Sequence, residues 1–349
     1  MRGVVLLALA ACGRIGFDAG TPTHSQLSLD RAVPGEPVTD FPLLVILDDT
    51  RANRTVMEPD ASDLRFSAAD GTPLAFEIER VGAAGGAPLV AWVRIPYVAD
   101  ATATITASYG VPGLARAPGT AWSDAYEAVW HMTGSGPLVD STTHHRDGVA
   151  TGTTEVAGQI ATARAFDGAK EEWIGVADGA SIQPPELTMS GWIDMASDEA
   201  SGYYGMVTRE LDDGGGDELY LGTMSQLAYG GAGANGVPDA ITGPMLQLRQ
   251  WTHVVFTYDG ARMLSYAGTT PGAPLVASGP IADSGDPVYI GADRNNSGGT
   301  TPVGVPDIDF VNGAVDEIRI ENVARDAAWI AYDLASQEDA IISYGPFTR

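Results

Sequence analysis

Hydrophobic and polar residues alternate with a period of two in most of the chain after residue 40. The clearest alternating segments are 103–109, 187–195 and 252–258, and the shorter run 74–78 has the same pattern. Because successive side chains of a β-strand point to opposite faces, this period predicts half-buried antiparallel strands. The segment 41–47 is instead apolar throughout, which is typical of a strand covered on both faces. These patterns predict an all-β protein.

Turn and helix signals complete this pattern. The Asp-Gly pair at 259–260 separates two strand-like runs and predicts a hairpin turn. Near the C-terminus, Asp326 is a suitable N-cap for a helix. Ala327, Ile330 and Leu334 then recur at helical spacing. We therefore predict one short C-terminal helix that packs this side on a sheet.

Length and charge narrow the classes of function. A chain of 349 residues is longer than one hydrophobic core usually supports, so two domains are expected. The 19 basic and 45 acidic residues give a formal net charge of -26. Lys170 is the only lysine and the arginines are scattered, so no basic patch is available for phosphate backbones. We expect no nucleic-acid partner.

The N-terminus has the features of an export signal. Arg2 precedes an apolar run, Gly3–Leu9, and small residues lead to Cys12, the only cysteine. Leu9-Ala10-Ala11-Cys12 resembles the bacterial lipobox, which implies cleavage before Cys12 and acylation of that residue. We expect residues 1–11 to be a lipoprotein signal peptide and residues 12–26 to be the lipidated cysteine with a flexible tether. The implied location is the cell envelope, lipid-anchored in the outer membrane or at the cell surface, with no other membrane contact.

Residues 27–120 resemble an uncharacterised extracellular bacterial β domain that is associated with biopolymer-transport proteins. The resemblance implies a small β-sandwich but no activity. It is carried by four short ordered motifs: Phe41-Pro42-Leu43-Leu44-Val45, Ser62-Asp63-Leu64-Arg65-Phe66, Ala91-Trp92-Val93-Arg94-Ile95-Pro96 and Ser108-Tyr109-Gly110-Val111-Pro112.

Residues 121–349 resemble the laminin G-like domains of the concanavalin A-like lectin/glucanase superfamily. This resemblance implies an antiparallel jelly-roll sandwich, which follows the small sandwich and carries the short helix. The motifs that carry it are Glu127–Met132, Ala165-Phe166-Asp167-Gly168, Leu187–Trp192, Trp251–Gly260, Tyr289-Ile290-Gly291 and Phe310–Ile320.

Laminin G-like domains often hold calcium at the rim of the sandwich, and no other cofactor is expected. By resemblance the candidate ligands are Asp140, Asp147, Asp167 and Asp316. The alternative is that these aspartates cap turns or accept hydrogen bonds from strand-edge amides. Zinc is not expected at the adjacent pair His144-His145, because neighbouring residues of a strand point to opposite faces.

The candidate ligand-binding residues are aromatic. Trp173, Tyr203, Tyr204 and Tyr220 lie near predicted loops and could stack on sugar rings. By analogy with the fold, we predict a non-catalytic surface lipoprotein that binds a glycan or a surface polymer, with calcium-dependent binding as one hypothesis. The alternatives are a cryptic polysaccharide hydrolase or lyase and a structural or protein-binding adhesion module.

Glu317 and Glu321 are the nearest match to a glycosidase pair. They share a strand face, but Arg319 stands where a retaining enzyme would need its second acid. The Glu-Arg-Glu alternation favours an ion-paired outer face of the sandwich instead.

Overall fold

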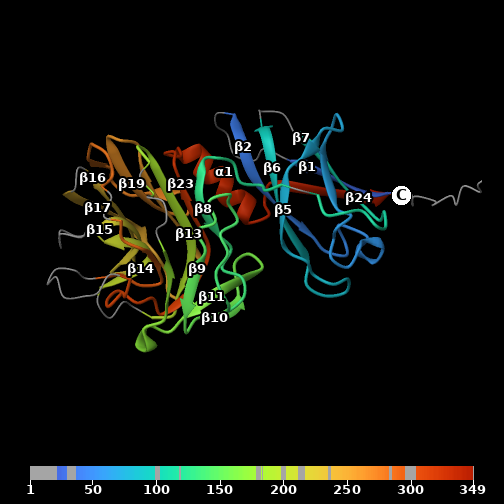
Figure 1. Ribbon diagram of the computed structural model, residues 1–349. Coiled ribbons are helices and arrows are strands. Elements are labelled where there is room, and N and C mark those ends of the chain that lie inside the picture. Colours follow the sequence, from blue (N-terminus) through green and yellow to red (C-terminus); the bar gives the residue numbers. More distant parts are fainter. Residues whose placement is uncertain are drawn as a thin grey trace, which may run out of the picture.

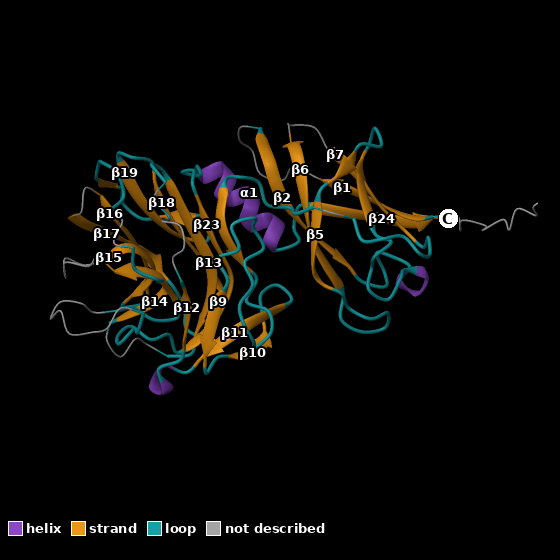
Figure 2. Cartoon of the chain, viewed as in Figure 1, coloured by secondary structure: helices purple, strands orange, loops and turns teal. Residues whose placement is uncertain are grey.

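Two β-sandwiches lie side by side, with an α-helix between them (Figures 1 and 2). The computed structural model describes residues 22–29, 37–98, 103–117, 119–177, 182, 184–197, 202–210, 217–234, 237–282, 285–294 and 304–348. All pairs of neighbouring strands in these segments are antiparallel, as the alternating pattern predicts. The all-β fold class is confirmed.

The first sandwich pairs a five-stranded sheet in the order β24-β1-β7-β3-β4 with a three-stranded sheet in the order β2-β6-β5. A short 3-10 helix follows β2. The bounds are β1 Thr23–Leu29, β2 Val38–Leu47, the 3-10 helix Arg54–Val56, β3 Arg65–Ala68, β4 Pro73–Leu74, β5 Phe76–Arg80, β6 Leu89–Val98, β7 Ala103–Tyr109 and β24 Ile342–Thr348.

The second sandwich has larger sheets. One runs β10-β11-β23-β13-β18-β19-β20, with β8 paired to β23 and β21 to β19, and the other runs β17-β16-β15-β14-β22-β12-β9. The bounds are β8 Tyr126–Trp130, β9 Gly148–Thr151, β10 Thr154–Ala157, β11 Thr162–Phe166, a 3-10 helix Gly168–Lys170, β12 Trp173–Val176, β13 Leu187–Met195, β14 Tyr203–Glu210, β15 Asp217–Met224, β16 Leu227–Ala234, β17 Val237–Met245, β18 Thr252–Tyr258, β19 Arg262–Ala267, β20 Thr270–Pro271, β21 Leu275–Val276, β22 Val288–Ile290 and β23 Gly313–Glu321.

The predicted inward faces form the two cores. In β13, the apolar residues at every second position belong to the core of the second sandwich. The inward residues of β18, the neighbouring strand in the same sheet, lie beside them in this core. In β7, Ile105, Ala107 and Tyr109 fill the core of the first sandwich. β2 is covered on both faces, as its continuous apolar run predicts: Leu43 packs in the first core, whereas Leu44 contacts the cluster between the sandwiches.

The helix α1, Ala327–Gln337, begins at the predicted cap, where the Asp326 side chain accepts a hydrogen bond from the Trp329 amide. Its predicted packing face is only partly right. Ile330 is buried, but Ala327 is exposed and Leu334 half-buried. The reason is that α1 lies between two bodies. Trp329 contacts Phe41 of the first sandwich, and Ile330 packs on the second.

The end of the predicted tether differs in the structure. Residues 23–26 belong to β1, in which Thr23 and Ser25 are buried, because small polar side chains fit the inward positions beside β7. The predicted signal peptide and Cys12 lie outside the described residues. Within the described part of the chain, no helix has the length and apolar character needed to cross a membrane.

The last strand returns to the first sandwich. β24 pairs with β1, and Leu27 and Leu29 stand opposite Tyr344 and Ile342. Sequence order gave no sign of this pairing, since residues 342–348 follow the second sandwich directly. The first sandwich is therefore built from both ends of the described chain.

Candidate functional site

A pocket of about 450 Å³ opens at one end of the second sandwich. It forms where β11, β13 and β14 begin or end and where the segment before β23 crosses them. Its polar lining consists of Asp167, Ser197, Tyr204, Asp307, Asp309 and Asn312. We call this site the rim pocket.

Ser197 links the polar groups of the rim pocket. Its hydroxyl lies 3.2 Å from the Tyr204 hydroxyl and accepts a hydrogen bond of 2.9 Å from the Asn312 side-chain amide. Asp309 has a left-handed backbone (φ 54°), and its carboxylate accepts a hydrogen bond from the Tyr220 hydroxyl. Strained backbone of this kind is common at binding sites.

The carboxylate of Asp167 stands at the mouth of the rim pocket. Its Oδ1 accepts a hydrogen bond from the Ala169 amide, and its Oδ2 lies 2.8 Å from Lys170 Nζ. The hydrogen bond from Lys170 lowers the pKa of Asp167, so this group is ionised at neutral pH. With Asp307 and Asp309, the rim pocket collects three carboxyl groups.

The four predicted aromatic residues do not lie together in one site of the structure. Tyr204 lines the rim pocket. Tyr203 and Tyr220 form a cluster with Tyr229, with ring centroids 5.1 to 6.4 Å apart. The residues beside Tyr220, Leu219 and Leu221, face the core, so this cluster lies on the outer face of the seven-stranded sheet.

Trp173 lies on β12, two strands away from β14 in the same sheet. Its indole packs against Tyr289 at 5.9 Å and covers Gly175, where a Cβ atom would stand 2.6 Å from the ring. The outer face of this sheet thus carries aromatic rings on five neighbouring strands, β12, β22, β14, β15 and β16.

The four calcium candidates do not form one group of ligands. Asp140 is buried and accepts hydrogen bonds from the Val129, Thr142 and Arg146 amides. Asp147 accepts one from the Asp140 amide. This is the turn-capping role considered above. Asp316 is buried between the sandwiches and accepts a hydrogen bond from the Ile160 amide, so of the four only Asp167 reaches the rim pocket.

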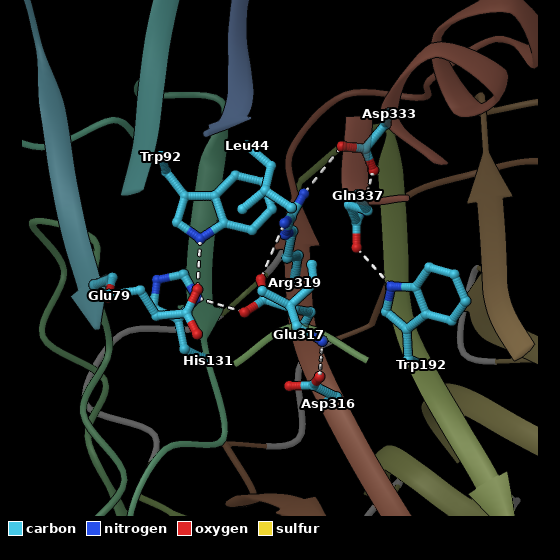
Figure 3. A network of polar contacts seen from close by, with 12 residues as sticks. Leu44, Glu79, Trp92, His131, Trp192, Asp316, Glu317, Arg319, Asp333 and Gln337 are labelled. Carbon is cyan, nitrogen blue, oxygen red and sulfur yellow. Dashed lines mark hydrogen bonds and ion pairs between the residues drawn. The ribbon is translucent and has the colours of Figure 1, made fainter. Parts of the chain in front are cut away.

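A second polar region, which we call the interface cluster, lies between the sandwiches (Figure 3). It consists of Glu79 on β5, His131 immediately after β8, and Glu317 on β23. His131 Nδ1 lies 2.7 Å from Glu317 Oε1 and 3.8 Å from Glu79 Oε2. Among the described residues, these three side chains are the one group whose ligand atoms lie close enough together, within 4.8 Å, to hold a metal ion.

Hydrogen bonds continue from the interface cluster to α1 (Figure 3). Arg319 donates to Glu317 at 3.0 Å and to Asp333 at 3.1 Å. Gln337 donates to Asp333 and accepts a hydrogen bond from the Trp192 indole. The chain of contacts ties β23, α1 and β13 into one buried network.

Burial and mutual charge shift the pKa values in the interface cluster. Burial, followed by the nearby charge of Glu317, raises the pKa of Glu79 to about 7. Burial lowers the pKa of His131, but the negative charges of Glu317 and Glu79 outweigh it and hold this pKa well above its ordinary value. Burial, with the charge of Glu317, also raises the pKa of Asp316. Nearby positive charge or bound protons therefore stabilise the buried carboxyl groups of this region.

The expected outer face with Glu317, Arg319 and Glu321 is ion-paired but not open to solvent. Arg319 pairs with Glu317, whereas Glu321 pairs with Arg325. The first sandwich and α1 cover this face, and Glu317 and Glu321 are only 1% and 4% exposed. These two carboxylates cannot contact a polysaccharide in this arrangement.

The interface cluster was not predicted from the sequence. His131 stands inside a motif that indicated only the fold, and Glu79 directly follows the alternating run 74–78. The one available signal was the position of Glu317 beside Asp316 and Arg319, an unusual density of charge for a strand.

The paired antiparallel sheets and their order define a concanavalin A-like β-sandwich. Residues 167–331 match the family model of the Concanavalin A-like lectin/glucanases superfamily, which is somewhat less than half of the chain. A comparison with curated proteins gives no significant match.

Solved structures are similar to part of this chain at low sequence identity. They include the binding domain of Paraclostridial Mosquitocidal Protein 1 (TM-score 0.48, 12% identity, 61% of this chain, 52% of that chain) and the receptor-binding domain of botulinum neurotoxin type G (0.46, 10%, 61% and 52%). A third is domain 4 of AbnA, an extracellular arabinanase from Geobacillus stearothermophilus, in complex with arabinotriose (0.45, 17%, 60% and 98%). The matches span about half of the two toxin domains.

Proposed function

We propose that this protein is a non-catalytic surface lipoprotein that binds a glycan or another surface polymer in the rim pocket. The observation that carries the proposal is the rim pocket itself, in which Tyr204, Asn312 and three carboxyl groups converge on about 450 Å³. A volume of this order and a few convergent polar groups are typical of small-ligand sites.

The chemistry of the lining suits a neutral saccharide. Carboxylates accept hydrogen bonds from sugar hydroxyls, and Asn312 offers both a donor and an acceptor. The net charge of -26 disfavours a polyanionic polymer unless a cation bridges it to the protein.

Calcium could supply that bridge. Asp167, Asp307 and Asp309 place hard oxygen ligands around the rim pocket, and calcium takes six to eight such oxygens. The calcium dependence that we propose therefore rests on Asp167 from the original candidates, together with two aspartates that were not among them.

The anchor is the second part of the proposal. Acylation of Cys12 would hold the sandwiches at a membrane surface, because several acyl chains bury enough methylene groups for stable attachment. Labelling cells with a fatty-acid analogue should mark the wild-type protein but not Cys12→Ser. Equal labelling of both would contradict the anchor.

A glycan array that includes cell-wall polymers tests the binding proposal, with and without a calcium chelator. We expect Asp307→Asn to weaken binding about tenfold or more, because hydrogen bonds to charged groups contribute about 1.5 to 3 kcal/mol each. Asn312→Ala removes neutral hydrogen bonds, which contribute about 0.5 to 1.5 kcal/mol each, and should weaken binding about two- to tenfold. Glu186→Gln, an exposed acid outside the rim pocket, is the matched control. Absence of saccharide or polymer binding would contradict the proposal, and binding unaffected by the chelator would remove calcium from it.

A further inference from the structure

We propose that the interface cluster is a binding site for a divalent transition-metal ion that joins the two sandwiches. Glu79 comes from the first sandwich, whereas His131 and Glu317 come from the second (Figure 3). An ion held by all three would cross-link elements of the two sandwiches.

The ligand atoms already face one another. His131 Nδ1 lies between Glu317 Oε1 at 2.7 Å and Glu79 Oε2 at 3.8 Å. The carboxylate of Glu317 reaches this position because β23 bulges there: its backbone is left-handed (φ 50°), and the register with β13 shifts between Ser190 and Trp192. Bulges re-aim side chains, and the strain they carry is common at functional sites.

One buried atom points independently to a missing ligand. Glu79 Oε1 has no hydrogen-bond partner among the described residues, although the Glu79 side chain is only 1% exposed. Unpartnered buried polar atoms are costly, so such atoms in a folded protein need an explanation. A bound ion would contact the Glu79 carboxylate. A small closing movement of the site would bring His131 Nε2 within hydrogen-bond distance of a neighbouring carboxylate.

That carboxylate belongs to Glu77. Its Oε2 lies 3.7 Å from His131 Nε2, and its side chain is 23% exposed, which leaves a path from solvent. Metal-bound histidines usually donate their second ring N–H to a carboxylate, and metal-bound carboxylates are themselves hydrogen-bonded. The Trp92 indole donates to Glu79 at 2.9 Å, and Arg319 donates to Glu317 at 3.0 Å. The outer contacts of a metal site are therefore in place.

One imidazole nitrogen and two carboxylate oxygens favour Zn²⁺ or Mn²⁺ over Ca²⁺, which prefers a larger set of oxygens. Binding at Nδ1 displaces the proton that His131 otherwise shares with Glu317, and this proton is released to solvent. The ion thus replaces one positive charge with two, beside three carboxylates, Glu77, Glu79 and Glu317, that pair with His131 and Arg319.

Titration calorimetry of the full chain, freed of metal with a chelator, tests the site with Zn²⁺, Mn²⁺ and Ca²⁺. We expect one Zn²⁺ or Mn²⁺ to bind per chain, at least tenfold more tightly than Ca²⁺. Glu79→Gln and Glu317→Gln should weaken binding about 100-fold or more, and Glu77→Gln about tenfold or more. Glu186→Gln should bind like the wild type. Circular dichroism in chelator shows whether each variant is folded.

A crystal of the wild-type protein soaked in zinc gives a second readout that needs no variant. Anomalous scattering should place the ion between Glu79, His131 and Glu317. Zinc found only elsewhere, or affinity unchanged in a folded Glu79→Gln, would overturn the proposal. So would the absence of Zn²⁺ and Mn²⁺ binding to the wild type, and the cluster would then be a proton-linked polar contact.

Discussion

The rim pocket and the interface cluster both gather carboxyl groups, but in opposite surroundings. At the rim, Asp167 is partly exposed and bonded to Lys170, so its pKa is lowered and its charge is stable. At the interface, burial raises the pKa of Glu79 to about 7. A carboxylate is thus partly solvated, with a lowered pKa, in one place and buried, with a raised pKa, in the other.

We therefore expect the rim pocket to affect ligand binding and the interface cluster to affect stability. Changes at Asp167 and Asp307 of the rim pocket should alter ligand binding and leave folding intact, because water already reaches those two side chains. Changes at the interface should alter stability and the coupling of the two sandwiches, because buried charges depend on their partners.

Deleting residues 341–349 should have the largest effect, because it removes the strand that completes the first sandwich and thereby the cover of the interface cluster. It eliminates the β1–β24 pairing, the fully buried Ile341 and the hydrogen bond from the Ile46 amide to Tyr344. Loss of one buried isoleucine alone costs about 2 to 5 kcal/mol, so the first sandwich should unfold at least about 10 °C lower. Scanning calorimetry should show a separate early transition.

Removing only residues 348 and 349 is the matched control for this deletion and should change the profile little. A single transition at the wild-type temperature in the longer deletion would show that β24 is dispensable.

Arg319→Met should be the most damaging single substitution. It leaves Glu317 and Asp333 buried without their shared cation, and breaking a buried pair in this way costs about 3 to 5 kcal/mol. Arg262→Met, which removes an exposed pair with Asp259, should cost about 1 kcal/mol or less. Urea unfolding of both variants measures the contrast, and equal losses would refute it.

His253 should make the protein acid-sensitive. Burial lowers its pKa from 6.5 to about 4. The unfolded chain therefore binds a proton that the folded chain excludes as pH falls from 6.5 to about 4, and the free energy of unfolding drops by about 3 kcal/mol in this window. At higher pH both states are neutral at this position, so the effect is absent. His253→Phe should lose about this much pH dependence, and unchanged pH dependence in urea unfolding would count against a buried neutral histidine.

Two aspartates from the calcium prediction should behave differently. Asp140→Asn removes acceptors for the Arg146 amide and the Thr142 hydroxyl in a buried turn, and should cost about 2 kcal/mol. Asp167→Asn at the rim should leave the melting temperature unchanged and weaken any calcium binding. Equal melting temperatures of the two variants would contradict the assignment of Asp140 as a turn cap and of Asp167 as a rim ligand.

Local patterns in the chain were sufficient for the strands. Alternation placed the inward residues of β7, β13 and β18, a continuous apolar run placed β2, and Asp326 placed the start of α1. These features depend on neighbours within a few residues, so they can be seen without a fold. Tyr204 was predicted as a ligand-binding residue from its place near a loop, and Asp167 as a calcium ligand from the family resemblance; the structure places both in the lining of the rim pocket.

Only the tertiary structure decided which side chains meet. His131 and Glu317 are 186 positions apart, and Glu79 belongs to the other sandwich. α1 is buried on two sides and β24 crosses back to β1 because two bodies pack together, which a period along one element does not reveal. Periodicity reports whether a residue is covered, but the identity of its partner depends on how distant segments are brought together.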